Sequence, residues 1–345
     1  MKPLSTSTCI LLVVTYTVGA FTFSPSSTTS FKLSTIQTKH NDNNKRTRLF
    51  MTALDYKNIK VMVNGMPGPM ATAAAEACLR KGLSLSPIAM TGPDVEPSTI
   101  TVHDTVSGNS ANVKLIPSTQ IEEIITSIEK VRNKVGIENF LAIDYTHPSA
   151  VNSNAMFYAK NSIPFVMGTT GGDRGQLMRD MENAKASAVI APNMGKQIVA
   201  LQAGLEDLAK KFPSAFGGYK LHVRESHQKT KADTSGTAKA VVDSLKVLSD
   251  EKNFTYDDIE MIRDDQESLE FGVKDEHLKG HAFHTYTLTS PDGSVEFQLK
   301  HNVSGRTVYA EGTADAIKFL AKKISEGKGG LIYSMINVLE EGAME

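Results

Sequence analysis

The segment from Glu225 to Lys239 holds the densest set of side chains in this sequence that could carry out chemistry. His227 can give or take a proton near neutral pH, and Lys231 follows it closely. Ser235-Gly236-Thr237 would place hydroxyls and free backbone N–H groups at the start of a helix, which favours an anion such as a carboxylate. These groups suit a dicarboxylate that needs a proton and a hydride. A solvated basic loop before a capped helix remains the alternative.

The remaining histidines and the cysteines do not form a recognisable metal motif. The 9 histidines are scattered and lack paired ligand spacing, so the sequence predicts no metal. Of the 2 cysteines, Cys9 lies in a segment that we expect to be removed. Cys78 alone permits neither an intrachain disulfide nor a cysteine-based metal site.

A glycine-containing turn near residue 65 is typical of nucleotide binding. The expected strand Ile59–Val63 runs into Gly65-Met66-Pro67-Gly68-Pro69-Met70 and then into a helix. Glycines at such a turn let backbone N–H groups approach a pyrophosphate, which the helix N-terminus also attracts. The G-x-x-G spacing departs from the standard form, so an ordinary turn is the alternative. The turn follows the first strand of a pattern in which strands and helices alternate, and this place favours nucleotide binding.

Three further loops of small or polar residues follow expected strands. They are Asp144-Tyr145-Thr146-His147-Pro148, Gly168-Thr169-Thr170-Gly171-Gly172 and the run from Ala191 through Pro192, Asn193 and Met194. Ligands of open parallel sheets bind outside the carboxyl ends of the strands, where these loops lie. Each alone could be a plain loop, but together they predict a cofactor site in which Asn193 could bind a carboxamide.

Strands and helices alternate from residue 59 to residue 211, which predicts a parallel, doubly wound α/β sheet. The stretch 91–110 is rich in Gly, Pro, Ser and Thr and is expected to form loop or short edge strands. The expected strands are Ile59–Val63, Leu85–Met90, Val113–Ile116, Leu141–Tyr145, Ile163–Met167 and Ala188–Ala191, and the helices are Pro69–Lys81, Gln120–Val131, Ala150–Lys160, Gly175–Ala184 and Ile198–Lys211.

The pattern changes after Gly195 to that of an α+β domain. Apolar and polar residues alternate in Ser294–Val303, as in an antiparallel sheet packed on one side. We therefore expect a nucleotide-binding domain over 55–194, a second domain over 195–307, and a C-terminal helical segment, 308–345, that returns to the first domain. The expected elements are the strands Tyr219–Glu225, Ile259–Arg263, Ala282–Thr289 and Ser294–Val303 and the helices Thr237–Leu248 and Thr313–Lys323.

The N-terminus has the composition of a targeting sequence. Residues 9–20 form an apolar run too short to span a bilayer, so residues 1–20 are interpreted as a signal peptide. Residues 21–54 are basic and rich in Ser and Thr, as in a transit peptide. The pair, with Phe21 after the expected cleavage site, resembles the bipartite presequence of algae whose plastid has extra membranes. It predicts a plastid-stroma protein without a membrane segment; a secreted protein with a polar stalk is the alternative, which the absence of a disulfide framework disfavours.

The charge balance bears on the class of partner. The net charge is -1, and six of the basic residues lie in the first 50, so the remainder is mildly acidic. A nucleic-acid-binding body would carry a basic surplus. We therefore expect small-molecule chemistry without a nucleic-acid partner.

The motifs together resemble the dihydrodipicolinate reductase family from Ile59 to the C-terminus. The resemblance is carried by the glycine loop at 65–70, by Gly168-Thr169-Thr170-Gly171, by His227 with Lys231 before Ser235-Gly236-Thr237, by His301-Asn302-Val303-Ser304-Gly305-Arg306 and by Tyr309-Ala310-Glu311-Gly312. Glu225-Ser226-His227-Gln228 and Gly280-His281-Ala282-Phe283-His284 are similar to the plant-type branch.

The resemblance implies a Rossmann-like domain, a mixed-sheet domain that builds a homotetramer, and a substrate cleft between them. His227 matches the proton donor or acceptor, and Lys231 matches a second proton donor or carboxylate partner. Gly236 and Thr237, with Ser235, match the residues that hold a substrate carboxylate, and Gln228 matches a substrate contact that is a second histidine in bacterial members. Residues 65–70, 168–170 and 191–194 match the cofactor contacts.

The implied reaction is NAD(P)H-dependent reduction of 4-hydroxy-tetrahydrodipicolinate in lysine biosynthesis. Ala89-Met90-Thr91-Gly92 offers no acid for a ribose 2′-hydroxyl, which favours NADPH, and no Arg for a 2′-phosphate, so use of NADH is also expected. Departures from the family pattern are a shorter Asp233-Thr234-Ser235 segment, Ala71 where many members have glycine, and a stiffer loop at Pro67 and Pro69. Another two-domain NAD(P) dehydrogenase and a non-catalytic nucleotide sensor are the rival interpretations.

Overall fold

The structure is a computed structural model that describes residues 54–342. The expected signal peptide, and the transit peptide up to residue 53, lie outside the described residues. Within 54–342, no helix combines the length and apolar character needed to cross a membrane.

Six parallel strands form the first sheet of the described chain, which confirms the predicted α/β fold class. Because the sheet is covered on both faces, its strands are mostly buried, except β13 at the edge, which is half-buried. In spatial order they are β13 (Ile332–Tyr333), β8 (Ala188–Ile190), β7 (Phe165–Met167), β6 (Phe140–Asp144), β1 (Lys60–Asn64) and β2 (Ser84–Leu85).

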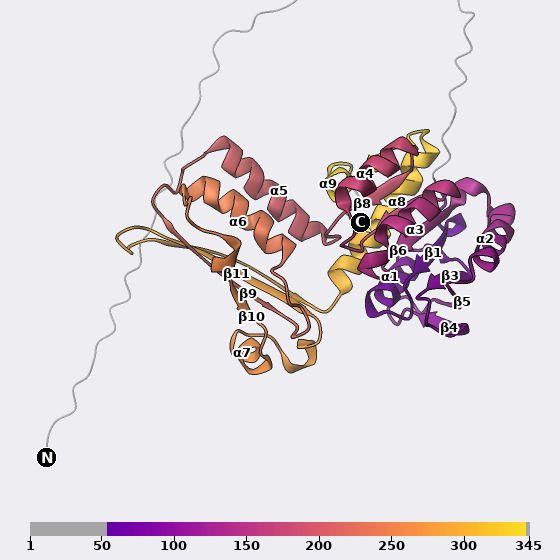
Figure 1. The fold of residues 1–345 in the computed structure, drawn as a ribbon, viewed down its shortest axis with the longest axis horizontal. Coiled ribbons are helices and arrows are strands. Elements are labelled where there is room, and N and C mark those ends of the chain that lie inside the picture. The colour runs from indigo at the N-terminus through magenta and orange to yellow at the C-terminus, as the bar shows by residue number, and fades with distance from the viewer. Residues whose placement is uncertain (1–53, 343–345) are drawn as a thin grey trace, which may run out of the picture. The chain divides into compact units, whose positions relative to one another are not determined.

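Alternate side chains of these strands enter two separate cores. Val61 and Leu141 pack with α1 (Pro69–Arg80) and α8 (Thr307–Ser325) on one face. Met62 and Ala142 pack on the other face with helices α2 (Ile121–Val135), α3 (Val151–Lys160) and α4 (Arg174–Asn183). The long helix α8, from the C-terminal part of the chain, thus lies against α1, the first α-helix of the fold (Figure 1). The short α9 (Met335–Glu340) packs into the same core.

The single strand predicted over Leu85–Met90 is wrong. Pro87 has no N–H to donate and restricts the residue before it, so the strand breaks at this point. β2 stays with β1, whereas β3 (Ile88–Thr91) pairs with β5 (Ser110–Pro117) in a separate three-stranded sheet. Its third strand, β4 (Ser98–His103), confirms the short strand expected within 91–110.

The second half of the chain forms a mixed sheet, as predicted. Its spatial order is β10 (Glu260–Ile262), β9 (Lys220–His227), β11 (His281–Thr289) and β12 (Glu296–Ser304), with β9 and β10 parallel and the other pairs antiparallel. α5 (Lys196–Lys211) and α6 (Gly236–Ser249) lie side by side over one face (Figure 1). The short α7 (Asp265–Glu270) follows β10.

Candidate active site

A cleft of about 740 Å³ joins the carboxyl ends of the parallel strands to the start of α6. This volume falls in the usual range for small-ligand sites. The cleft gathers many of the residues predicted separately for cofactor and substrate. They are Met70, Gly168, Thr169, Thr170, Pro192, Asn193 and Met194 on the cofactor side and Lys231, Ser235, Gly236 and Thr237 on the substrate side.

Other predicted site residues lie outside the lining of this cleft. The glycine-loop residues 65–69, Ala191 and His227 are not among those that line it within the described chain, and Gln228 borders a separate cavity with Lys229 and Asp265. Gly65 has φ +99°, and a Cβ there would lie 2.2 Å from the carbonyl oxygen of Tyr145. The glycine is therefore required by a close approach of two loops, and its predicted cofactor contact stays a prediction.

Asp144 at the end of β6 organises the cofactor-side loops. Its buried carboxylate accepts hydrogen bonds from the hydroxyls of Tyr158 (2.6 Å), Thr146 (2.7 Å) and Thr169 (3.0 Å), and from the side-chain amide of Asn154 (3.0 Å). Burial, and then the Asp144 charge, raise the pKa of Tyr158 well above its usual value, which keeps the phenol a donor. Such partners are what a buried carboxylate requires.

Small residues at these strand ends leave space that suits a flat ring. A Cβ on Gly168 would lie 2.5 Å from the ring of Tyr145, so a larger residue at this position would require that ring to move. Thr169 and Thr170 follow it on the cleft wall. The residues present therefore fit the nicotinamide end of a dinucleotide, with Gly168, Thr169 and Thr170 as its platform.

Asn193 connects the two sides of the cleft. Its side-chain amide donates to the Thr237 hydroxyl (3.0 Å), and its oxygen accepts from the N–H of Gly195 (2.8 Å). Asn193 was predicted as a cofactor contact, and in this structure it also reaches the substrate-side helix. Gly312 on α8 supports the same loop, because a Cβ there would lie 1.7 Å from the carbonyl oxygen of Met194.

The start of α6 has the features of an anion site. Ser235 is the N-cap, and its side chain makes no capping hydrogen bond within the described chain, so the first helical N–H groups are not occupied by it. Lys231 and Lys239 both line the cleft beside Gly236 and Thr237. The Lys231 ammonium donates to Asp233 (2.7 Å), an exposed partner that a ligand carboxylate could replace.

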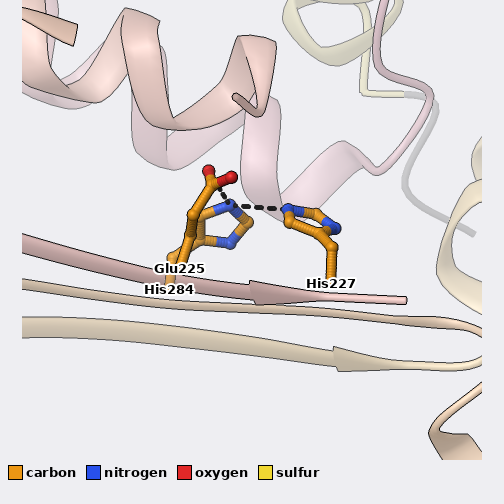
Figure 2. Close-up of side chains that lie close together, drawn as sticks. All are labelled: Glu225, His227 and His284. Atoms are coloured by element: carbon orange, nitrogen blue, oxygen red, sulfur yellow. Dashed lines mark hydrogen bonds and ion pairs between the residues drawn. The ribbon is translucent and has the colours of Figure 1, made fainter. Parts of the chain in front are cut away.

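His227 ends β9 and is 6% exposed. Its Nδ1 lies 3.1 Å from the carbonyl oxygen of His281, and its Nε2 lies 3.3 Å from Nε2 of His284 (Figure 2). Burial, and then the neighbouring His284, lower the pKa of His227 to about 3. The ring is therefore neutral at pH 7, and Nδ1 donates to the carbonyl while Nε2 carries the lone pair.

Glu225 is a fully buried carboxylate two residues before His227. It accepts from Arg263 (2.5 Å) and from the N–H of Ser235 (3.1 Å), and it lies 3.7 Å from Nε2 of His284. Burial alone would raise the pKa of Glu225, but the neighbouring His284 and the ion pair with Arg263 outweigh it and lower the pKa to about 2. Glu225 is therefore ionised at neutral pH.

Glu225, His227 and His284 bring three possible metal-ligand atoms within 4.8 Å of one another. The sequence prediction of scattered histidines misses this cluster because His284 comes from β11, opposite Glu225 in the sheet register. Arg263 already pairs with the Glu225 carboxylate, and a cation would have to compete with it.

Four further residues line the cleft although the sequence assigned none of them an individual role: Tyr145, Gln202, Lys239 and Tyr309. Tyr145 lies in a loop predicted at the cofactor site, Lys239 ends the segment rich in chemical side chains, and Tyr309 lies in a family motif, whereas Gln202 on α5 carries no sequence signal. Glu225 also stands in a motif, but no linear pattern shows that it is buried or that it pairs with Arg263.

Two family models match consecutive parts of the chain. Residues 59–194 match the dihydrodipicolinate reductase N-terminus, and residues 198–339 match the dihydrodipicolinate reductase C-terminus. The chain belongs to the dihydrodipicolinate reductase family. The family resemblance inferred from the motifs is thereby confirmed.

Plant members of the dihydrodipicolinate reductase family are similar over most of their length. The probable 4-hydroxy-tetrahydrodipicolinate reductase 1, chloroplastic, of Oryza sativa subsp. japonica is 46% identical, over 82% of this chain and 79% of that protein. The chloroplastic reductase 1 of Arabidopsis thaliana is 45% identical, over 85% and 81%. These identities confirm the plant-type branch.

A solved structure is similar in fold. The dipicolinate-bound dihydrodipicolinate reductase from Paenisporosarcina sp. TG-14 aligns with a TM-score of 0.51 at 19% identity, covering 80% of this chain and 97% of that one. At that identity the likeness concerns the fold alone, and it confirms the Rossmann-like sheet with an added mixed-sheet domain.

Proposed function

We propose that this protein catalyses the NAD(P)H-dependent reduction, with loss of water, of 4-hydroxy-tetrahydrodipicolinate to tetrahydrodipicolinate in the diaminopimelate route of lysine biosynthesis. The observation that carries the proposal is the cleft in which the nicotinamide platform faces an anion site. The plant relatives that are 44–46% identical bear the name of this reductase, which supports the same reaction.

The substrate side of the cleft recognises the dicarboxylate. The first N–H groups of α6 at Gly236 and Thr237 hold one carboxylate, and Lys231 leaves Asp233 to bind the other. When bound, the reduced nicotinamide supplies the hydride to the conjugated ring carbon. Holding the ring over Gly168–Thr170 at the correct distance is the main contribution of the chain.

His227 handles the accompanying proton. It is neutral in the free enzyme, so it starts as a base. A dicarboxylate brings two negative charges toward it, which raises its pKa and favours a protonated ring. The substrate loses its hydroxyl as water, and one hydride and one proton are added, so that the atoms balance. His227 does not line the cleft in this structure. To contact the substrate, the end of β9 that carries His227 must therefore move toward the bound substrate.

We propose NADPH as the preferred cofactor, with NADH also accepted. The tip of β3 carries no acid, and the Thr91 hydroxyl already donates to the carbonyl oxygen of Met66 (2.6 Å). No side chain there would repel a 2′-phosphate, which supports use of NADPH. Residues 55–194 would form the cofactor domain and residues 195–307 the substrate domain, with 308–345 returning to the first.

We also propose a homotetramer in the plastid stroma. Val295 and Phe297 on or next to β12 are 41% and 49% exposed, and such apolar side chains at a sheet edge support association. The chloroplastic relatives support a plastid location for the mature chain.

A coupled assay tests the function. The preceding synthase would generate the substrate from pyruvate and aspartate semialdehyde, and absorbance would follow oxidation of NADPH by protein starting near Met51. We expect oxidation that depends on the synthase, and a repeat with NADH gives the preference. Folded protein that binds NADPH but shows no synthase-dependent oxidation would favour another dehydrogenase or a nucleotide sensor.

A further inference from the structure

His284 occupies a position that none of the roles above uses. It lies on β11 directly opposite Glu225 of β9, and its side chain is 1% exposed. Nε2 is 3.3 Å from Nε2 of His227 and 3.7 Å from the Glu225 carboxylate (Figure 2). Its ring stacks on His301, with centroids 4.5 Å apart and an interplanar angle of 16°. These contacts hold the ring in one orientation.

The hydrogen positions in the pair follow from its other contacts. Nδ1 of His227 donates to the carbonyl of His281, so Nε2 of the neutral ring is an acceptor. A hydrogen bond between two imidazole nitrogens 3.3 Å apart needs one N–H donor. Because Nε2 of His227 is the acceptor, the donor is Nε2–H of His284. Its Nδ1 is then a bare acceptor, and this buried atom has no hydrogen-bond partner among residues 54–342. A bare acceptor is the less costly atom to leave unpaired.

We propose that His284, supported by Glu225, is a positioning residue for the reduction: it holds the ring of His227, whose tautomer the His281 carbonyl sets, in one orientation until bound substrate takes the place of His284 at Nε2. Glu225 favours an Nε2–H on His284 through its negative charge. The inference rests on the proposed function only for its kinetic readout, because the hydrogen bond at Nε2 of His227 can be observed without turnover.

Burial and several neighbouring groups set the proton affinity of His227. Glu225 on β9 favours the protonated ring, whereas His284 on β11, Arg263 after β10 and Lys231 on the following loop disfavour it. His281 contacts the ring through its backbone, and His301 stacks on the far side of His284. Removing His284 leaves Glu225 as a nearby charge and takes away a group that lowers the pKa. The pKa of His227 should therefore rise.

Three substitutions test the positioning role. His284→Leu removes the donor, and His284→Gln retains an N–H at nearly the same place. His222→Leu is the matched control, because His222 is an exposed histidine on the same strand as His227 that pairs with Glu260 and has no contact with His227 or His284 within the described chain. We expect His284→Leu to lower kcat roughly tenfold or more with KM values little changed, since proton transfer contributes about 10²–10⁴. His284→Gln should recover most of the loss, and His222→Leu should stay within about twofold of the unchanged protein.

Two further readouts separate positioning from a merely structural role. The acid limb of the kcat/KM profile should move to higher pH in His284→Leu. Nuclear magnetic resonance of isotope-labelled histidines should report Nδ1–H on His227 and Nε2–H on His284 in the unchanged protein, and the Nε2 resonance of His227 should shift in His284→Leu, where its hydrogen-bond donor is lost. Unchanged kcat and pH profile in His284→Leu would overturn the proposal, as would equal losses in His284→Leu and His284→Gln. If the unchanged protein shows no turnover, the proposed function fails, while the Nε2 resonance of His227 still decides whether His284 positions His227.

Discussion

Nη2 of Arg263 lies 2.5 Å from Oε1 of Glu225, and this ion pair links β9 and β10 to the loop that carries Lys231. The same guanidinium donates to the carbonyl oxygens of Lys231 (2.7 Å) and Asp233 (3.2 Å). Glu225 in turn accepts from the N–H of Ser235. One buried pair therefore holds both ends of the loop between His227 and Ser235.

Replacing Arg263 should weaken both the fold and the site. Arg263→Met leaves the Glu225 carboxylate buried without its main partner, which costs about 3–5 kcal/mol in comparable sites. The free energy of unfolding in urea would measure this loss, and the KM for substrate should rise because the Lys231 loop is released. Arg224→Met is the control, since Arg224 and Glu260 form an exposed pair worth about 1 kcal/mol or less. Equal stability of the two variants would contradict the role given to Arg263.

Replacing His227 should affect turnover far more than cofactor binding. His227→Ala removes the proton-transfer group, so kcat should fall by about 10²–10⁴. His227 lies outside the residues lining the cofactor platform, so the Kd for NADPH, measured by fluorescence, should stay near that of the unchanged protein. Unchanged turnover would show that another group moves the proton.

Replacing Gly312 should disturb the loop that ends in Met194. An added Cβ would overlap the Met194 carbonyl, so Gly312→Ala must move α8 or the loop, at a cost of about 1–3 kcal/mol. We expect a lower Tm and weaker NADPH binding. Gly204→Ala is the matched control, because Gly204 is exposed on α5 with open space around its Cβ position, and alanine there should be neutral or stabilising by about 0.5–1 kcal/mol. If the Gly312→Ala variant were stable and bound NADPH normally, the close contact of Gly312 with Met194 would not be what supports this loop.

Acid should destabilise the protein through two neighbouring groups. The pKa of Glu225 is lowered to about 2, so its stabilising contribution is present above its ordinary pKa near 4.5 and is lost as pH falls toward 2. The pKa of His227 is lowered to about 3, so below its ordinary pKa near 6.5 the unfolded chain binds the extra proton and stability falls. His227→Gln should therefore lose less stability than the unchanged protein between about pH 6.5 and pH 4 in urea unfolding. Parallel curves for the two proteins would refute the lowered pKa of His227.

Local patterns predicted most of the elements because their causes are local. The alternation of apolar strands with helices indicated the parallel sheet, and the strands expected at Ala282–Thr289 and Ser294–Val303 correspond closely to β11 and β12. The prediction of one strand over 85–90 was wrong because Pro87 breaks it. The pairing of β3 with β5 depends on a segment outside the local pattern of β3.

The sequence by itself determined the fold class, the residue types of the anion site and the family, because these depend on periodicity and on short motifs. Only the tertiary structure decided which side chains meet. His284, Glu225 and Arg263 come from three different strands or their ends, and they surround His227 only through sheet register and burial. Burial also decided that His227 is neutral and Glu225 charged, because the cost of a charge depends on the water and partners around it, which no linear spacing contains.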